Sequence, residues 1–196
     1  MTQRQARVER RTGETDIEIA ISLDGSGEYR IETGVGFLNH MLCLFAKHGA
    51  LDLTVKAAGD THIDDHHTVE DIGITLGRAV RQALGDKQGI NRYGHALVPM
   101  DEALVLAALD VSGRGHLEFD LPLPAAKVGS FDTELVEEFL RALALNSGIT
   151  LHVRLLSGRN THHIIEGAFK ALGRALRQAV ARDERVPGIP STKGVL

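Results

Sequence analysis

The chain has 196 residues, of which 43% are hydrophobic and 24% charged, and its formal net charge is −4; this composition is typical of a folded globular protein. The near-neutral charge gives no general affinity for nucleic acid or an acidic membrane, and aromatic residues at 4% leave few platforms for stacking bases. No apolar run approaches the ~20 residues that span a membrane, and the polar first residues predict no signal peptide. The single cysteine, Cys43, cannot form an internal disulfide, so we expect a cytoplasmic protein.

Taken in chain order, the sequence predicts three strands, a helix, a strand and a helix, and then the same series again. The first series comprises strands at 6–11, 15–23 and 28–32, a helix ending at Gly49, a strand at 51–55 and a helix at 66–84. The second comprises strands at 95–100, 103–111 and 115–121, a helix ending at Gly148, a strand at 149–153 and a helix at 162–182. The turn-rich segment 85–94 joins them, so we expect repeat halves at 1–90 and 91–196 that form one structural unit.

An internal repeat underlies this order. Residues 66–83 and 162–179 are identical at ten of eighteen positions, which indicates duplication rather than a solenoid of many repeats. The fold class is therefore predicted as α+β, with two β-β-β-α-β-α halves. Each half should form a mostly antiparallel sheet with two helices on one face. Small and aliphatic residues on the long helices suit close packing, so the halves should meet through their helical layers about a pseudo-twofold axis.

The two long helices begin with the same His-His-x-x-Glu pattern. The helix at 66–84 begins with His66, His67 and Glu70, after a capping residue at Asp64 or Asp65. The helix at 162–182 begins with the same pattern, after a capping residue at Asn160 or Thr161. Side-by-side histidines point about 100° apart on a helix, so each should serve a different ion. A polar helix start is the alternative for one such cluster, but repetition at matching positions favours metal ligands.

The helix before each cluster adds one more donor, because His40 corresponds to Glu138. The chain then offers eight donors, enough for two ions with open positions for substrate. Mixed histidine and carboxylate ligands favour Mn²⁺, with Zn²⁺, Fe²⁺ or Co²⁺ as possible replacements. The eight are His40, His66, His67, Glu70, Glu138, His162, His163 and Glu166.

Anion-binding candidates lie outside the clusters. Arg92 and Arg114 stand at turns where a guanidinium can hold a phosphate, although each alone is more often a surface arginine. The tail offers Ser191, Thr192 and Lys193 beside a glycine, which suits an anion cradle or a frayed terminus.

Several motifs resemble the imidazoleglycerol-phosphate dehydratase family of histidine biosynthesis over about residues 7–196: "FLNHML", "GDTHIDDHHTVEDI", "GINRYG", "DEAL", "SGR", "GRNTHHIIEGAFKALGRALRQA" and "PSTKGVL". The resemblance implies a fold of the ribosomal-protein-S5 domain 2-like kind and a dimanganese site. It also implies dehydration of imidazole glycerol phosphate to imidazole acetol phosphate. An imidazole ring has two nitrogens, so two ions can hold it from both ends. This would explain why the cluster occurs twice.

The resemblance also assigns individual roles. The eight donors become the metal ligands, with Glu138 standing where the family usually has histidine and Asn39 where it usually has aspartate. Glu14 becomes the proton shuttle, outside both clusters and without a counterpart in the repeat. The implied substrate contacts are Glu14, His48, Arg92, Arg114, Lys170, Ser191, Thr192 and Lys193. The implied assembly is a homo-oligomer of about 24 subunits in which neighbouring subunits share sites.

Two other functions remain open from the residues. A dinuclear metallohydrolase could use both ions to activate water on a phosphate ester. A metal storage or assembly protein would use the clusters only to hold subunits together. The histidine-led clusters and the basic anion contacts argue against storage.

Overall fold

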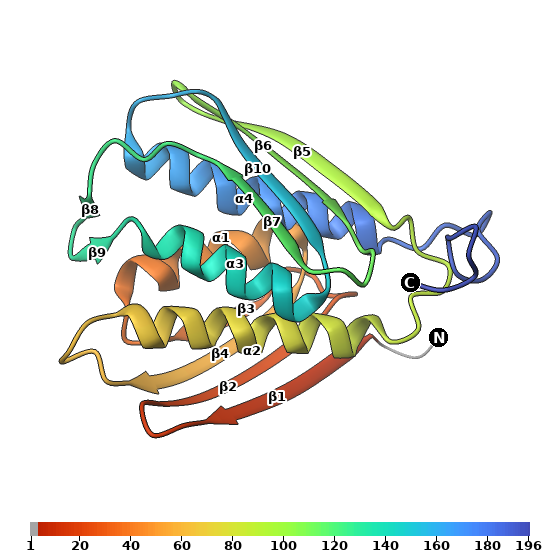
Figure 1. Cartoon of the computed structure of the whole chain (residues 1–196), viewed down its shortest axis with the longest axis horizontal. Coiled ribbons are helices and arrows are strands. Elements are labelled where there is room, and N and C mark those ends of the chain that lie inside the picture. Colours follow the sequence, from red (N-terminus) through yellow and green to blue (C-terminus); the bar gives the residue numbers. More distant parts are fainter. Residues whose placement is uncertain (1–3) are drawn as a thin grey trace.

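The computed structural model describes residues 4–196 and places four helices between two outer sheets (Figure 1). The first half contains β1 (Gln5–Arg11), β2 (Thr15–Ser22), β3 (Tyr29–Glu32), α1 (Gly36–Gly49), β4 (Asp52–Gly59) and α2 (His66–Leu84). The second contains β5 (Tyr93–Met100), β6 (Ala103–Asp110), β7 (His116–Asp120), β8 (Lys127–Val128), β9 (Phe131–Asp132), α3 (Leu135–Ser147), β10 (Thr150–Ser157) and α4 (Thr161–Val180). The predicted β-β-β-α-β-α order is confirmed in both halves, apart from the short β8–β9 hairpin.

The two four-stranded sheets have the same topology. Their strand orders are β1-β2-β4-β3 and β5-β6-β10-β7. Only β3–β4 and β7–β10 pair in parallel, so each sheet is mostly antiparallel, as predicted. The register also repeats. Arg11 pairs with Asp16 in the first hairpin, and the residues 88 positions further along the chain, Pro99 and Leu104, pair in the second.

The halves meet through their helices, which confirms the predicted packing. α2 lies on β1 and β2, and α4 lies on β5 and β6. Across the interface, α2 packs against α3, and α1 packs against α4. Alternating strand residues and one face of each helix fill the space between the sheets, so a single hydrophobic core joins both halves. This arrangement brings donors from α1 and α4 together although the sequence separates them.

Two details differ from the sequence-based expectation. The repeat offset grows from 88 to 98 residues after β7, because the second half contains the β8–β9 hairpin there. α4 ends at Val180 rather than 182, because Ala181 accepts the backbone N–H of Asn91 and Arg182 bridges to Ile90. No helix in residues 4–196 is long and apolar enough to cross a membrane.

Candidate functional site

Both long helices begin at a polar cap that presents their histidines in the first turn. In α4, the Asn160 side chain accepts the backbone N–H groups of His162 and His163, at 3.0 and 3.3 Å. In α2, the Asp64 side chain accepts the N–H of His66 at 2.8 Å, while Asp65 holds the N-cap position without a side-chain bond. The caps thereby satisfy the N–H groups of both histidines of α4 and of the first histidine of α2, which helps to fix where each helix begins.

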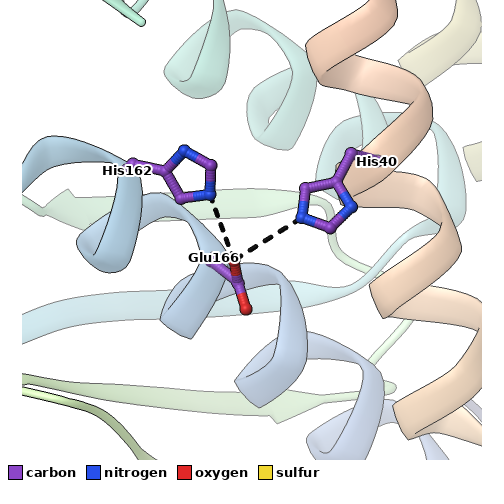
Figure 2. Close-up of side chains that lie close together, drawn as sticks. All are labelled: His40, His162 and Glu166. Atoms are coloured by element: carbon purple, nitrogen blue, oxygen red, sulfur yellow. Dashed lines mark hydrogen bonds and ion pairs between the residues drawn. The ribbon is translucent and has the colours of Figure 1, made fainter.

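Three predicted ligands converge at the interface of α1 and α4. His40 and His162 point their Nε2 atoms at the same oxygen of Glu166, at 3.5 and 3.2 Å (Figure 2). One ligand atom from each residue lies within 4.8 Å of the others. In residues 4–196, this is the only group of three or more His, Cys, Asp or Glu side chains that meets this limit. Imidazole nitrogen and carboxylate oxygen are suitable donors for a divalent transition metal, so the residues fit such an ion.

Glu166 is held in its ionised form. Burial raises the pKa of its carboxyl, but the hydrogen bond and charge of Lys170, with the contacts to His162 and His40, outweigh it and leave the pKa below its usual value. Lys170 Nζ lies 2.6 Å from Oε1, so Oε2 remains directed at the two histidines. Lys170 is one of the predicted substrate contacts, and the structure gives it this additional partner.

The neighbouring histidines point elsewhere, as their spacing predicted. The rings of His162 and His163 are inclined at 84° and those of His66 and His67 at 90°. Nδ1 of His163 lies 2.7 Å from Glu102, and Nδ1 of His67 lies 3.0 Å from Asp60.

These two carboxylates change the pKa values around His163 and His67, which we call the outer histidines. The hydrogen bond from His163, together with backbone donors, lowers the pKa of Glu102 to about 2. The hydrogen bond to Asp60 raises the pKa of His67. Glu14, the predicted proton shuttle, lies nearby, with a carboxylate oxygen 3.8 Å from His67 Nδ1.

The remaining predicted ligands are His66, Glu70 and Glu138. They are half-buried, on the first turns of α2 and α3. By the repeat they are the counterparts of His162, Glu166 and His40, but within the described chain they do not close into a comparable cluster.

The predicted anion contacts gather around a separate cavity of about 470 Å³. Its lining includes Arg92, Arg114, Ser191, Thr192 and Lys193, which brings together both arginine turns and the tail. Arg114 forms no ion pair with any residue from 4 to 196, so its charge is available to an anion.

Arg92 has a different setting from Arg114. Its guanidinium holds both oxygens of Asp110, at 2.7 and 3.1 Å, and donates to the carbonyl of Pro190 at 2.9 Å. Its φ of 72° is in the left-handed region, which costs a non-glycine residue on the order of 1 kcal/mol or more. Arg92 therefore anchors the tail beside the anion cavity.

The candidate metal cluster, formed by His40, His162 and Glu166, and the candidate anion cavity lie at opposite ends of α4. His162 is in the first turn of this helix, whereas Arg92 donates its backbone N–H to Ala179 at the other end. A helix of 20 residues is about 30 Å long. Figure 1 shows the first turns of α2 and α4 at one end of the molecule and the C-terminal tail at the other. His48, a predicted substrate contact, lies in the last turn of α1, where burial and the charges of Lys170 and Arg174 lower its pKa.

Several residues that contact the histidines of the candidate metal site were not predicted from the sequence. The segment that contains β8 and β9 packs beside the first turn of α4. The side chain of Thr161 accepts the backbone N–H of Ala125. Phe131 packs on Phe37, and the ring of Phe37 meets the ring of His162 edge-on, with 5.3 Å between the ring centres. A repeat search could not find this segment because the first half lacks it. Asp60 and Glu102 were missed because each resembles an ordinary turn carboxylate.

Known proteins match this chain over most of its length. The sequence model described as imidazoleglycerol-phosphate dehydratase matches residues 33–176. An imidazoleglycerol-phosphate dehydratase from Desulforamulus reducens is 80% identical over 196 residues, covering all of both chains. One from Acetivibrio thermocellus is 63% identical over 193 residues, covering 98% of this chain and 99% of that one.

Solved structures give the same result. The crystal structure of imidazoleglycerol-phosphate dehydratase from Staphylococcus aureus subsp. aureus N315 superposes with a TM-score of 0.83 at 46% identity, covering 91% of this chain and 99% of the other. The Pyrococcus furiosus enzyme in complex with (S)-C348 also gives 0.83, at 40% identity, covering 96% and 100%. The chain therefore belongs to the imidazoleglycerol-phosphate dehydratase family, a family of hydro-lyases of histidine biosynthesis.

Proposed function

We propose that this protein removes water from imidazole glycerol phosphate to give imidazole acetol phosphate, with two Mn²⁺ ions per active site, in an active site shared between copies of the chain. The observation that carries the shared site is the separation of metal cluster and anion cavity along α4. The three-carbon chain of the substrate is much shorter than this helix, which is about 30 Å long. One substrate molecule can therefore reach metal ligands and anion contacts only if they come from different copies.

The donor set supports two ions of the same kind. His40, His162 and Glu166 would hold one, and the repeat assigns His66, Glu70 and Glu138 to the other. Glu138 provides a carboxylate where the family usually has histidine, and carboxylates suit Mn²⁺ well.

The outer histidines would complete the sites of neighbouring copies. In residues 4–196, neither Nε2 of His67 nor Nε2 of His163 has a hydrogen-bond partner, although a carboxylate oxygen of Asp101 lies 3.8 Å from Nε2 of His163, and both rings lie near the surface. Two divalent ions held by these residues would supply Lewis-acid stabilisation to the imidazole ring of the substrate.

Glu14 is the residue best placed to move the proton. Its carboxylate lies beside His67 on an exposed turn, and a carboxylate can accept a proton from one carbon and deliver it to the hydroxyl leaving the adjacent carbon. The lost proton and hydroxyl make one water, and the resulting enol becomes the ketone. Glu14 would therefore act once in each direction per turnover.

The anion cavity would hold the phosphate of the substrate. Arg114, Lys193, Ser191 and Thr192 provide charge and hydroxyl donors, and Arg92 keeps the tail in place. His48 and Lys170 remain predicted substrate contacts. The single cysteine suits the cytoplasm, where we expect the protein to work.

One assay separates the candidate functions. The protein is incubated with Mn²⁺ and imidazole glycerol phosphate, and the products are identified. A dehydratase forms the ketone with the phosphate ester intact, a metallohydrolase releases inorganic phosphate, and a storage protein does neither. Release of phosphate without ketone would contradict the proposal.

A further inference from the structure

Glu102 occupies the same position in the second half as Glu14 does in the first. Each residue immediately precedes the second strand of a hairpin, and the two hairpins share one register 88 residues apart. Glu14 therefore does have a counterpart in the repeat, contrary to the expectation from sequence. The two carboxylates nevertheless have different partners.

The Glu102 carboxylate is fully engaged by the start of α4. Oε1 accepts the backbone N–H groups of Asn160 and Arg159, at 2.8 and 3.3 Å, and Oε2 lies 2.7 Å from Nδ1 of His163. Because Oε1 is held by two main-chain donors, Oε2 is fixed against the ring. A carboxylate can only accept, so in a neutral ring the proton resides on Nδ1 and Nε2 is left with its lone pair free.

In the first half, Asp60 makes the equivalent contact. Its Oδ2 lies 3.0 Å from Nδ1 of His67, but Asp60 follows the end of β4, whereas Glu102 lies in the turn between β5 and β6. The second half lacks this arrangement, because its residue at the corresponding end of β10 is Gly158. A side chain there would be strained, since the φ of Gly158 is +144° and a Cβ would lie 3.0 Å from Ala103.

We propose that Glu102 and Asp60 are positioning residues that fix the rings of His163 and His67 with Nε2 bare for a metal ion, and that Asp60 thereby leaves Glu14 free for proton transfer. This assignment rests on the proposed metal-dependent function. The two equivalent turn carboxylates thus have different roles. Glu102 orients a metal ligand, whereas Glu14 lies 3.8 Å from His67 and forms no hydrogen bond with it. Carboxylates that orient metal-binding histidines typically change metal affinity by about 10- to 100-fold when replaced.

The isosteric variant Glu102→Gln tests this because it reverses the hydrogen bond. The amide oxygen can still accept from Asn160, but the NH₂ group that replaces Oε2 is a donor and requires Nδ1 to accept. The ring proton then moves to Nε2, which blocks the ligand atom. We expect Mn²⁺ affinity, measured by competition with a fluorescent chelator, to fall about 10- to 100-fold, while the metal-free protein keeps a single cooperative melting transition.

Two control variants and one further test variant complete the design. Glu14→Gln changes the same turn position in the other half and should keep wild-type Mn²⁺ affinity. Glu118→Gln changes an exposed glutamate 3.8 Å from His116 and should also have no effect on affinity. Asp60→Asn should weaken Mn²⁺ binding as Glu102→Gln does, and it carries the test if Glu102→Gln fails to fold, because it leaves the start of α4 intact.

The outcomes separate this assignment from the proposed function. Wild-type affinity in folded Glu102→Gln and Asp60→Asn would overturn the positioning role alone. Equal losses in Glu14→Gln and Glu102→Gln would overturn the division between the two turns. A wild-type protein that binds no Mn²⁺ would overturn the proposed function and this assignment with it.

Discussion

Gly77 and Gly173 make the same contact in the two halves of the molecule. A Cβ at Gly77 on α2 would lie 2.7 Å from the carbonyl oxygen of Leu143 on α3, and one at Gly173 on α4 would lie 2.5 Å from that of Phe45 on α1. Real Cβ atoms essentially never approach other atoms this closely. The absence of a side chain at both positions lets each helix pair approach backbone to backbone, which sets where His40 meets His162.

Gly173→Ala should therefore destabilise the protein. The added methyl would push α1 away from α4, and overpacking of this kind costs typically about 1–3 kcal/mol. The measurement is the denaturation midpoint of the metal-free protein. Gly36→Ala is the matched control, because Gly36 is a glycine of the partner helix α1 where a Cβ meets nothing within 4 Å. Equal midpoints for the two variants would contradict the packing account.

Metal removal should make the particle smaller. If His67 and His163 complete the sites of neighbouring copies, then metal binding contributes free energy to assembly, and chelation removes it. Light scattering with and without chelator gives the mass, and metal analysis confirms that the ions are gone. An unchanged mass in the metal-free protein would argue against ligands that bridge subunits.

Loss of charge in the anion cavity should weaken substrate binding. Arg114→Ala and Lys193→Ala should each raise KM roughly ten- to a hundredfold at unchanged metal content, because a lost charge-assisted contact costs about 1.5–3 kcal/mol. Steady-state kinetics with metal analysis measures both. Normal KM in both variants would remove the phosphate assignment.

Arg92→Ala should behave differently from these two variants. It removes the bond to Pro190 as well as a charge, so the tail that carries Ser191 and Lys193 should loosen. Hydrogen exchange of the tail amides should increase in Arg92→Ala but not in Arg114→Ala. The same exchange in both would show that Arg92 is not an anchor.

Glu14→Gln keeps shape and polarity but cannot accept a proton. We expect kcat to fall by about 100-fold or more while the protein keeps its two ions per subunit. His163→Ala should instead lose metal and substrate binding together. Wild-type turnover in Glu14→Gln with both ions bound would rule out the proton shuttle.

The order of helices and strands could be predicted from the sequence because its two halves share a recognisable repeat. The boundaries of α2 were predicted at 66–84 because its polar cap and its apolar periodicity both mark them. The equivalence of Glu14 and Glu102 could not be found in the same way. The repeat offset is 88 residues in the hairpins and 96 in the long helices, so a single alignment misses one or the other. The contact between His40 and Glu166 also depends on how α1 packs against α4. Local sequence patterns do not predict this packing.

The shared active site is tested by mixing two impaired variants, assayed at a substrate concentration well below the raised KM of Arg114→Ala. His162→Ala disables the metal cluster, and Arg114→Ala disables the anion cavity at the other end of α4. Particles that contain both chains are isolated by two affinity tags, and their turnover is compared with that of each variant alone. A random mixture should recover up to about one quarter of wild-type turnover, because some sites then combine two intact parts from different chains.

A second pair provides the control for this experiment. His40→Ala with His162→Ala should recover nothing, because both residues belong to one cluster within a single chain, where they face the same oxygen of Glu166. Recovery in the first mixture alone is expected if neighbouring copies of the chain share each active site. No recovery from His162→Ala with Arg114→Ala, in particles shown to contain both chains, would contradict it.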